Sequence, residues 1–289
     1  MKFGVSSMIA SLKKVAVIKP GEALKNADPQ VWHYSNKFNP DKVSENHEDF
    51  IKALKDFGTE VYFMSEDDKG IADSVFTYDS SLMTPSGAII MSPGKKLRSG
   101  EQIIHRQFYE NNKIPIVGSV EGEAKAEAGD TLWLDDNTII IGRGFRTNEH
   151  GVIQLKNIFT SLGIEVHVFD LPVFSGNESC LHLMSLISIV DVKKALVYLP
   201  LLPVGFLELL IKKGFSLIEA PENEFYSSNT LNINILTMSP GKCIMLNNLP
   251  ETKTALINSE IEVKVFNGDE LCIGCEGGPT CLTRPLLRQ

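Results

Sequence analysis

Apolar runs with the patterns typical of strands and of helices alternate along the whole chain. Five β-rich runs end at or near a Gly, Pro or Asn turn, where strands usually stop. Each is followed by a segment whose apolar residues recur at the helical period, and then by a second β-rich run. The first runs span residues 15–19, 88–91, 138–141, 195–199 and 243–246. The predicted helices, each with the strand after it, span residues 50–57 and 60–63, 103–109 and 114–117, 153–162 and 165–169, 206–213 and 216–219, and 253–258 and 262–266.

This alternation predicts an α/β protein in which a strand, helix, strand unit is repeated five times. Matching positions recur roughly every 50 residues, a period typical of propellers and other arrays. An ordinary α/β sheet is the other interpretation of the same pattern. No Pro-rich or low-complexity linker divides the chain, so we expect one domain over residues 1–289. In a closed ring of five units, loops from all units would meet around one central axis.

Charge and hydropathy restrict the class of partner. The chain of 289 residues has a net charge of -8, and its Lys and Arg residues never form a run longer than a pair. These features do not favour a nucleic-acid or anionic-membrane partner, and no apolar stretch is long enough to span a bilayer. The first residues also lack the order of a secretory signal. We therefore expect a soluble protein that acts on a small molecule.

Cysteines are the first candidates for chemistry. Their odd number, five, in a chain of this size predicts reduced thiols and a cytoplasmic location. Cys281 follows Gly277-Gly278-Pro279, which predicts a loop in which the thiol is accessible. A nucleophile and a small buried side chain are both compatible with that position. For Cys180 and Cys243 we expect burial.

A Cys-x-x-Cys pair precedes the same loop. Cys272 and Cys275 could form a metal cluster or a redox pair with Cys281. One such pair without a second is a weak zinc signal, and the redox motif normally opens a helix, which the following glycines and proline would prevent. We expect no metal site here.

A cysteine nucleophile needs a neighbouring base or cation that lowers its pKa, and histidine is the usual choice. His182 lies in an apolar segment, where a polar side chain needs a reason for its burial. A hydrogen-bonded core histidine is the competing interpretation. The other five histidines lie in contexts typical of surface positions; they are His33, His47, His105, His150 and His167.

Carboxylates and arginines complete the candidate set. Asp73 and Asp79 lie six residues apart around a β-like run, so on a strand both would project from the same face. Glu127 stands beside a Gly turn and is a plausible ligand for a cation, although a solvated charge in a loop is the commoner role for such a residue. The guanidinium groups of Arg98, Arg143 and Arg146 could each bind a carboxylate through two hydrogen bonds.

In this order, the segments resemble the guanidino-modifying enzyme superfamily of arginine deiminases, dimethylarginine dimethylaminohydrolases and amidinotransferases. The resemblance covers about residues 70 to 289. It is carried by residues 73–79 (DSVFTYD), Arg98 with 100–101 (GE), 127–130 (EAGD), 142–148 (GRGFRTN), 182–183 (HL) and 277–283 (GGPTCLT). The resemblance implies the five-bladed α/β propeller called the pentein fold and a single amidinotransferase-like catalytic domain.

The resemblance also implies a mechanism without a cofactor. The thiolate of Cys281 would attack the guanidinium carbon, and His182 would protonate the leaving amine and then activate water, so that a covalent thiouronium intermediate is hydrolysed. Asp79 and the catalytic Glu127 would hold the planar guanidinium cation in place.

The same resemblance assigns the other end of the substrate. Asp73 would bind its α-amino group, and Arg98 and Arg146 would bind its α-carboxylate. The expected partner is thus a small guanidino compound, and a homodimer is compatible with the family.

Departures from the family patterns bear on the substrate. Arginine deiminases carry an Asp two residues after the catalytic His, whereas this chain has Met184. An apolar side chain there favours an N-methylated guanidino group, and hence hydrolysis of dimethylarginine to citrulline and dimethylamine. The chain also departs from dimethylarginine dimethylaminohydrolases at two positions: it has Tyr78 where they often have Glu, and Met184 where they often have Lys.

Three alternatives stay open. An arginine deiminase-like or dihydrolase-like enzyme and an amidinotransferase would keep the chemistry and change the substrate or acceptor. A non-catalytic binding protein on the same ring, like the ribosome-associated translation factors of this fold, belongs to another class. The presence of both Cys281 and His182 counts against that class.

Overall fold

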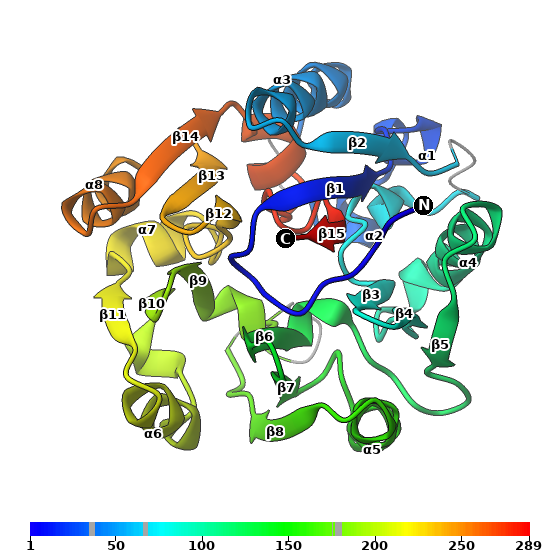
Figure 1. The fold of residues 1–289 in the computed structure, drawn as a ribbon. Coiled ribbons are helices and arrows are strands. Elements are labelled where there is room, and N and C mark those ends of the chain that lie inside the picture. Colours follow the sequence, from blue (N-terminus) through cyan, green and yellow to red (C-terminus); the bar gives the residue numbers. More distant parts are fainter. Residues whose placement is uncertain (35–37, 66–68, 175, 177–180) are drawn as a thin grey trace.

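The computed structural model describes residues 1–34, 38–65, 69–174, 176 and 181–289. Within these residues, five three-stranded sheets surround a central axis, and a helix lies on the outer side of each sheet (Figure 1). This arrangement confirms the predicted five-bladed α/β propeller of repeated strand, helix, strand units.

Each sheet follows one plan, as the blade that begins at β3 (Ser81–Thr84) illustrates. β3 forms an antiparallel hairpin with the central strand β4 (Gly87–Ile90), and α4 (Glu101–Asn111) then leads to β5 (Ile116–Ser119), which is parallel to β4. Parallel neighbouring strands need such a crossover connection. This explains why the helix of every blade lies between the central strand and its parallel neighbour along the chain.

Three further blades repeat this plan along the chain. One consists of β6 (Thr131–Asp135), β7 (Thr138–Arg143), α5 (Glu149–Ser161) and β8 (Glu165–Asp170). The next consists of β9 (Ile187–Asp191), β10 (Lys194–Val197), α6 (Val204–Lys212) and β11 (Ser216–Glu219), and α7 (Glu222–Ser227) follows it. The last consists of β12 (Leu236–Ser239), β13 (Lys242–Leu246), α8 (Pro250–Asn258) and β14 (Glu262–Phe266).

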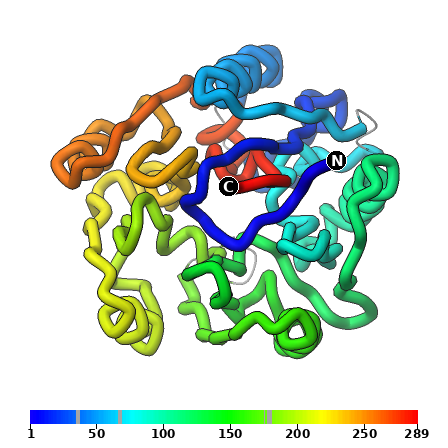
Figure 2. Tube along the Cα trace, viewed as in Figure 1, coloured from blue at the N-terminus to red at the C-terminus, as the bar shows by residue number. Residues whose placement is uncertain are grey.

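The remaining blade is assembled from both ends of the chain. β1 (Leu12–Val17), α3 (Val43–Asp56) and β2 (Glu60–Phe63) supply its N-terminal part. β15 (Arg284–Arg288) supplies the antiparallel strand, with Ala16 opposite Arg284. Figure 2 shows the blue N-terminal and red C-terminal segments side by side near the centre of the ring. The pairing of these two strands closes the propeller.

The pattern of the sequence located one kind of strand poorly. Every predicted strand and helix of the repeat corresponds to an element of the structure, with ends that differ by a few residues. The prediction omitted the antiparallel strand of each blade, which lies nearest the axis (Figure 1). The innermost strands are buried like the central strands, so neither kind alternates, but the innermost ones carry buried polar residues such as Ser81, Thr84 and Thr131 and therefore do not form a continuous apolar run.

Two sequence-based expectations are wrong in detail. Asp73 and Asp79 do not share a strand, because residues Ala72–Val75 form a 3₁₀ turn and the chain then turns again before β3. His47 and His105 are not surface residues, since their side chains are buried on the inner faces of α3 and α4.

The described cysteines and helices bear on two further expectations. Cys243 is buried, as are Cys272 and Cys275, and these thiols and Cys281 are free. Cys180 lies outside the described residues. In the part of the chain that the structure describes, no helix is both long and apolar enough to cross a membrane.

Candidate active site

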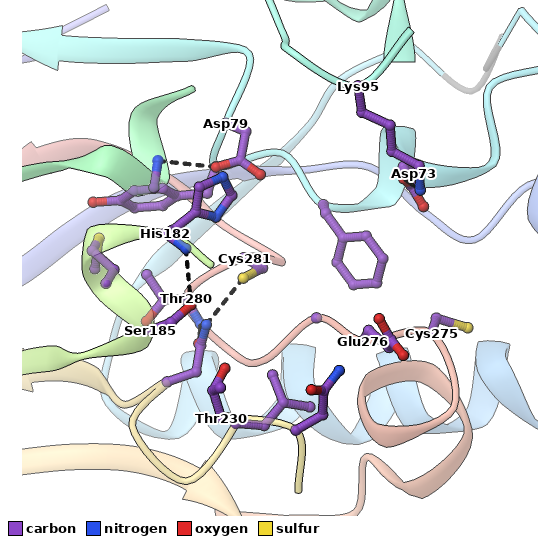
Figure 3. A pocket seen from close by; sticks show the side chains of 18 of the residues that line it. Asp73, Asp79, Lys95, His182, Ser185, Thr230, Cys275, Glu276, Thr280 and Cys281 are labelled. Atoms are coloured by element: carbon purple, nitrogen blue, oxygen red, sulfur yellow. Dashed lines mark hydrogen bonds and ion pairs between the residues drawn. The ribbon is translucent and has the colours of Figure 1, made fainter. Parts of the chain in front are cut away.

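A cavity of about 370 Å³ lies near the axis of the propeller and is lined by most of the predicted site residues (Figure 3). Its size falls within the range of small-molecule sites. The loops that enter the innermost strands supply many of its lining residues. These residues are Asp79 before β3, Gly129 before β6, His182 before β9, Asn234 before β12 and Cys281 before β15.

The thiol of Cys281 is held by an amide. Asn234 Nδ2 donates a hydrogen bond to Cys281 Sγ at 3.0 Å, and Asn234 Oδ1 accepts one from the Thr280 backbone N–H at 2.9 Å. The second bond fixes which end of the amide faces sulfur. Burial raises the pKa of the Cys281 thiol to about 11, and the charge of Asp79 acts in the same direction, whereas His182 and the hydrogen bond from Asn234 oppose them. Without substrate, the group is a thiol at neutral pH.

His182 is oriented by a buried carboxylate. Its Nε2 lies 2.7 Å from Glu127 Oε2, while Arg146 Nη1 donates to the same oxygen at 3.0 Å and the Gly94 backbone N–H donates to Oε1 at 2.8 Å. Burial alone would raise the pKa of Glu127, but the positive charges of Arg146 and His182 hold it well below its usual value. Glu127 is therefore an anion that favours a protonated imidazole.

The backbone next to His182 is held by Asp130. Asp130 Oδ1 accepts a hydrogen bond from the Leu183 N–H at 3.0 Å, and Thr147 Oγ1 lies 2.6 Å from Oδ2. Burial raises the pKa of Asp130 to about 6. This carboxyl group links the entry of β6 to the entry of β9 and so helps to position His182.

Asp79 is aligned by an arginine that is itself immobilised. Asp79 Oδ1 accepts from the Gly129 N–H at 2.9 Å, and Oδ2 accepts from Arg98 Nη1 at 2.6 Å. Arg98 Nε and Nη2 donate to the two carboxylate oxygens of Glu101, both at 2.8 Å. Arg98 thus lines the cavity and orients Asp79, and its binding of a substrate carboxylate stays a prediction.

Glycines permit the close approach of these groups. A Cβ at Gly129 would lie 2.6 Å from His182 Nδ1 and 2.8 Å from Asp79 Oδ1. A Cβ at Gly277 would meet the ring of Phe76, and one at Gly278 would meet Asn234. The glycines of the EAGD and GGPTC segments therefore leave the space in which the polar side chains converge.

The opposite side of the cavity contains Asp73 (Figure 3). Asp73 Oδ2 lies 2.6 Å from Lys95 Nζ, and Tyr34 Oη donates to Oδ1 at 2.5 Å. Arg143, by contrast, pairs with Asp170 at the surface and does not line the cavity.

One group of side chains has a spacing that a metal ion could use. Asp79, Glu127 and His182 offer ligand atoms within 4.8 Å of one another. Both carboxylates already accept hydrogen bonds from arginine, so the group does not need a metal ion to balance its charge. Among the described residues, the cysteines form no such group.

Sequence reasoning missed two contributors, Asn234 and Lys95. Asn234 occupies the same place before β12 as Asp79 does before β3, two residues from the strand. A register drawn from the repeat could have found it. Lys95 is the first of two adjacent lysines, and only the structure distinguishes it from its exposed neighbour Lys96.

Comparison with known proteins agrees with this geometry. The arginine deiminase family model matches residues 69–204. N(G),N(G)-dimethylarginine dimethylaminohydrolase from Pseudomonas aeruginosa is 31% identical over 203 residues, which is 69% of this chain and 73% of that protein. The chain belongs to the guanidino-modifying pentein superfamily, close to dimethylarginine dimethylaminohydrolase.

Other matches place this pentein in the same group. Arginine deiminase from Listeria welshimeri is 24% identical over 284 residues, covering 86% of this chain and 69% of that protein. The structure of the Pseudomonas aeruginosa dimethylarginine dimethylaminohydrolase complexed with citrulline has the same fold, with a TM-score of 0.76 and 23% identity over 95% of this chain and 99% of that one. This pentein is a hydrolase of C–N bonds in guanidino groups.

Proposed function

We propose that residues 1–289 form one catalytic domain that converts dimethylarginine to citrulline and dimethylamine, with Cys281 as the nucleophile. The observation that carries the proposal is the convergence of Cys281, His182 and Asp79 on one cavity, with the buried Glu127 orienting His182. Sulfur, a proton-transfer group and anions for a planar cation are the parts that this reaction requires.

The proposed reaction has two halves. In the first, the Cys281 thiolate bonds to the guanidinium carbon, His182 donates a proton to the dimethylamine nitrogen, and the C–N bond to that nitrogen breaks. In the second, water bonds to the carbon of the resulting thiouronium group and gives a proton to His182. The C–S bond then breaks, its electron pair returns to sulfur, and the hydroxyl proton passes to sulfur as the C=O bond forms, so that citrulline leaves and the Cys281 thiol is restored.

The substrate cation itself supplies the activation of the thiol. With a pKa of about 11, Cys281 is protonated in the resting enzyme. A guanidinium placed beside sulfur would stabilise the thiolate in the same way as any nearby positive charge. Asp79 is already oriented by Arg98, so it can align the cation without reorganising.

The environment of the guanidinium supports an N-methylated substrate. Met184, two residues after His182, is buried and lines the cavity, where an arginine-specific site would need a further carboxylate. The name of the Pseudomonas aeruginosa relative supports the same substrate.

The test is product analysis after incubation of the reduced protein with asymmetric dimethylarginine and, separately, with arginine. We expect citrulline and dimethylamine from the first substrate, and a loss of kcat of about 10³ or more in Cys281→Ser, because a hydroxyl is a far weaker nucleophile at neutral pH. Cys275→Ser changes another thiol of the same cavity and should retain turnover.

Other outcomes would redirect the assignment. Ammonia and citrulline from arginine would indicate a deiminase, ornithine a dihydrolase, and transfer to an added amine an amidinotransferase. Full activity of a correctly folded Cys281→Ser protein would exclude the mechanism. No turnover of any guanidino compound would favour the non-catalytic binding protein.

A further inference from the structure

The carboxylate expected to bind a substrate α-ammonium already has two partners. Lys95 Nζ lies 2.6 Å from Asp73 Oδ2, and Tyr34 Oη donates to Oδ1 at 2.5 Å. The side chains of Lys95 and Asp73 are only 15% and 8% exposed, so water screens this ion pair weakly.

Lys95 is fixed in this position by further contacts. Its Nζ donates to the Trp32 carbonyl oxygen at 3.1 Å and lies 5.1 Å from the centre of the Trp32 ring. An ammonium held by a carboxylate, a carbonyl and an aromatic face differs from a mobile surface lysine. Binding of a second ammonium at Asp73 would therefore require either displacement of Lys95 or the approach of two like charges.

A carboxylate meets the opposite situation. At the end of the cavity that contains Asp73, Lys95 places a positive charge beside the carboxylate (Figure 3). Arg98 and Arg146 also line the cavity, but they pair with Asp79 and Glu127 near His182. Besides Asp73, the described residues at this end of the cavity include one other carboxylate, Glu276. Its side chain is exposed, so Glu276 is a weaker partner for an ammonium.

We propose that Lys95 determines the substrate class of this site. The class is the ω-guanidino carboxylates, and Asp73 does not recognise an α-ammonium of the substrate because Lys95 is already paired with this carboxylate. The proposal deepens the proposed function and rests on it, because the same Cys281 chemistry reports the selectivity. Lys95 neutralises Asp73 and attracts the substrate carboxylate, so a substrate without the amino group is accepted as readily as dimethylarginine.

The first measurement compares dimethylarginine with its analogue that lacks the α-amino group, 5-(N′,N′-dimethylguanidino)pentanoate, in the wild-type enzyme. We expect the analogue to have a kcat/KM within threefold of that of dimethylarginine, or higher. A preference of more than threefold for dimethylarginine would overturn the proposal. This comparison needs no variant, so it is decisive even if substitution of Lys95 impairs folding.

The second measurement repeats the comparison in Lys95→Met. Removal of the ammonium leaves Asp73 free to bind an α-ammonium, so the ratio of the two kcat/KM values should shift by at least tenfold toward dimethylarginine, mainly through KM. Lys96→Met changes the exposed neighbour and should leave the ratio unchanged. An unchanged ratio in folded Lys95→Met, or an equal shift in Lys96→Met, would refute the role of Lys95.

Failure of this inference is distinguishable from failure of the proposed function. If the wild-type enzyme converts dimethylarginine but prefers it strongly over the analogue, only the role of Lys95 is lost. If it converts neither compound, the assignment of dimethylarginine as substrate class is lost, and the selectivity that depends on it is lost as well.

Discussion

Contacts of single side chains decide the reactivity of Cys281. The thiol shares its cavity with the carboxylate of Asp79, which raises its pKa, while the amide of Asn234 lowers it. Asn234 belongs to the entry of β12, 47 positions away from Cys281 in the sequence. A residue so distant along the chain acts on sulfur because both lie before innermost strands.

Replacement of Asn234 should make the thiol less reactive. We expect the iodoacetamide alkylation rate of the free enzyme to rise about tenfold per pH unit between pH 7 and 10, because the pKa of Cys281 is raised to about 11 and only the thiolate reacts. Asn234→Leu removes a hydrogen bond that stabilises the thiolate, so the rate at pH 8 should fall several-fold. The exposed Asn248→Leu is the control. Equal rates in Asn234→Leu and the wild type would show that the amide does not influence sulfur.

Loops that enter the innermost strands are the elements that build the site. Asp130, at the entry of β6, accepts the Leu183 N–H at the entry of β9, so two blades are joined directly behind His182. Leu183 N–H would otherwise lack this buried acceptor. The contact links the stability of the ring to the position of the proton-transfer group.

The ionisation of Asp130 should appear in the pH dependence of stability. Its folded-state pKa of about 6 lies above the ordinary value, so the folded state holds the proton more tightly and loses stability as pH rises from 4 to 6. A shift of two pKa units corresponds to a decrease of about 3 kcal/mol in the free energy of unfolding over this pH range. The Asp130→Asn variant has no carboxyl group to ionise, so it should not show this decrease. Urea unfolding of both proteins at pH 4 and pH 7 measures the difference. The Asp136→Asn variant, which changes an exposed residue, should show the same pH dependence as the wild type. If Asp130→Asn also showed the wild-type pH dependence, the raised pKa would not belong to Asp130.

At the scale of the whole molecule, the ring is closed by strands from the two ends of the chain. β15 pairs with β1, the Gly4 N–H donates to the Leu286 carbonyl, and the Arg288 N–H donates to the Gly4 carbonyl. Cys281 precedes β15 by three residues, so the same strand that completes the ring also fixes the nucleophile.

Removal of the closing strand should therefore abolish both structure and activity. A chain that ends at residue 283 loses the partner of β1 and leaves its hydrogen-bonding edge and apolar side chains open to water. We expect loss of the cooperative thermal transition, measured by circular dichroism, and loss of turnover. Deletion of Gln289 alone should have little effect. A cooperative, active protein without residues 284–289 would show that closure is dispensable.

The sequence alone contains much of this structure. The change between β-rich runs and helical periodicity marks the central strand, helix and parallel strand of every blade. The central strands are short, mostly apolar runs because they are buried, as in β4 and β7, whereas the helices and the outer parallel strands each have an exposed face. The segments around Asp79, Glu127 and Cys281 were also recognisable from glycines or short motifs with polar residues, and His182 stood out as a polar residue in an apolar segment. The structure brings Asp79, His182 and Cys281 together at one cavity and buries Glu127 against His182.

Only the tertiary structure decided which loops meet and what each charge does there. The innermost strands are buried and interrupted by polar residues such as Ser81 and Thr84, so no apolar run or alternation marks them, and the 3₁₀ turn after Ile71 replaces the strand expected around Asp73. Lys95 and Lys96 are identical in sequence terms, yet one is an ion-pair partner in the cavity and the other is exposed. The chain by itself specifies local periodicity and motifs, whereas the pairing of Asn234 with Cys281 and of Lys95 with Asp73 depends on the tertiary structure. Such contacts join residues 22 and 47 positions apart, beyond the range over which a local pattern of the sequence can record them.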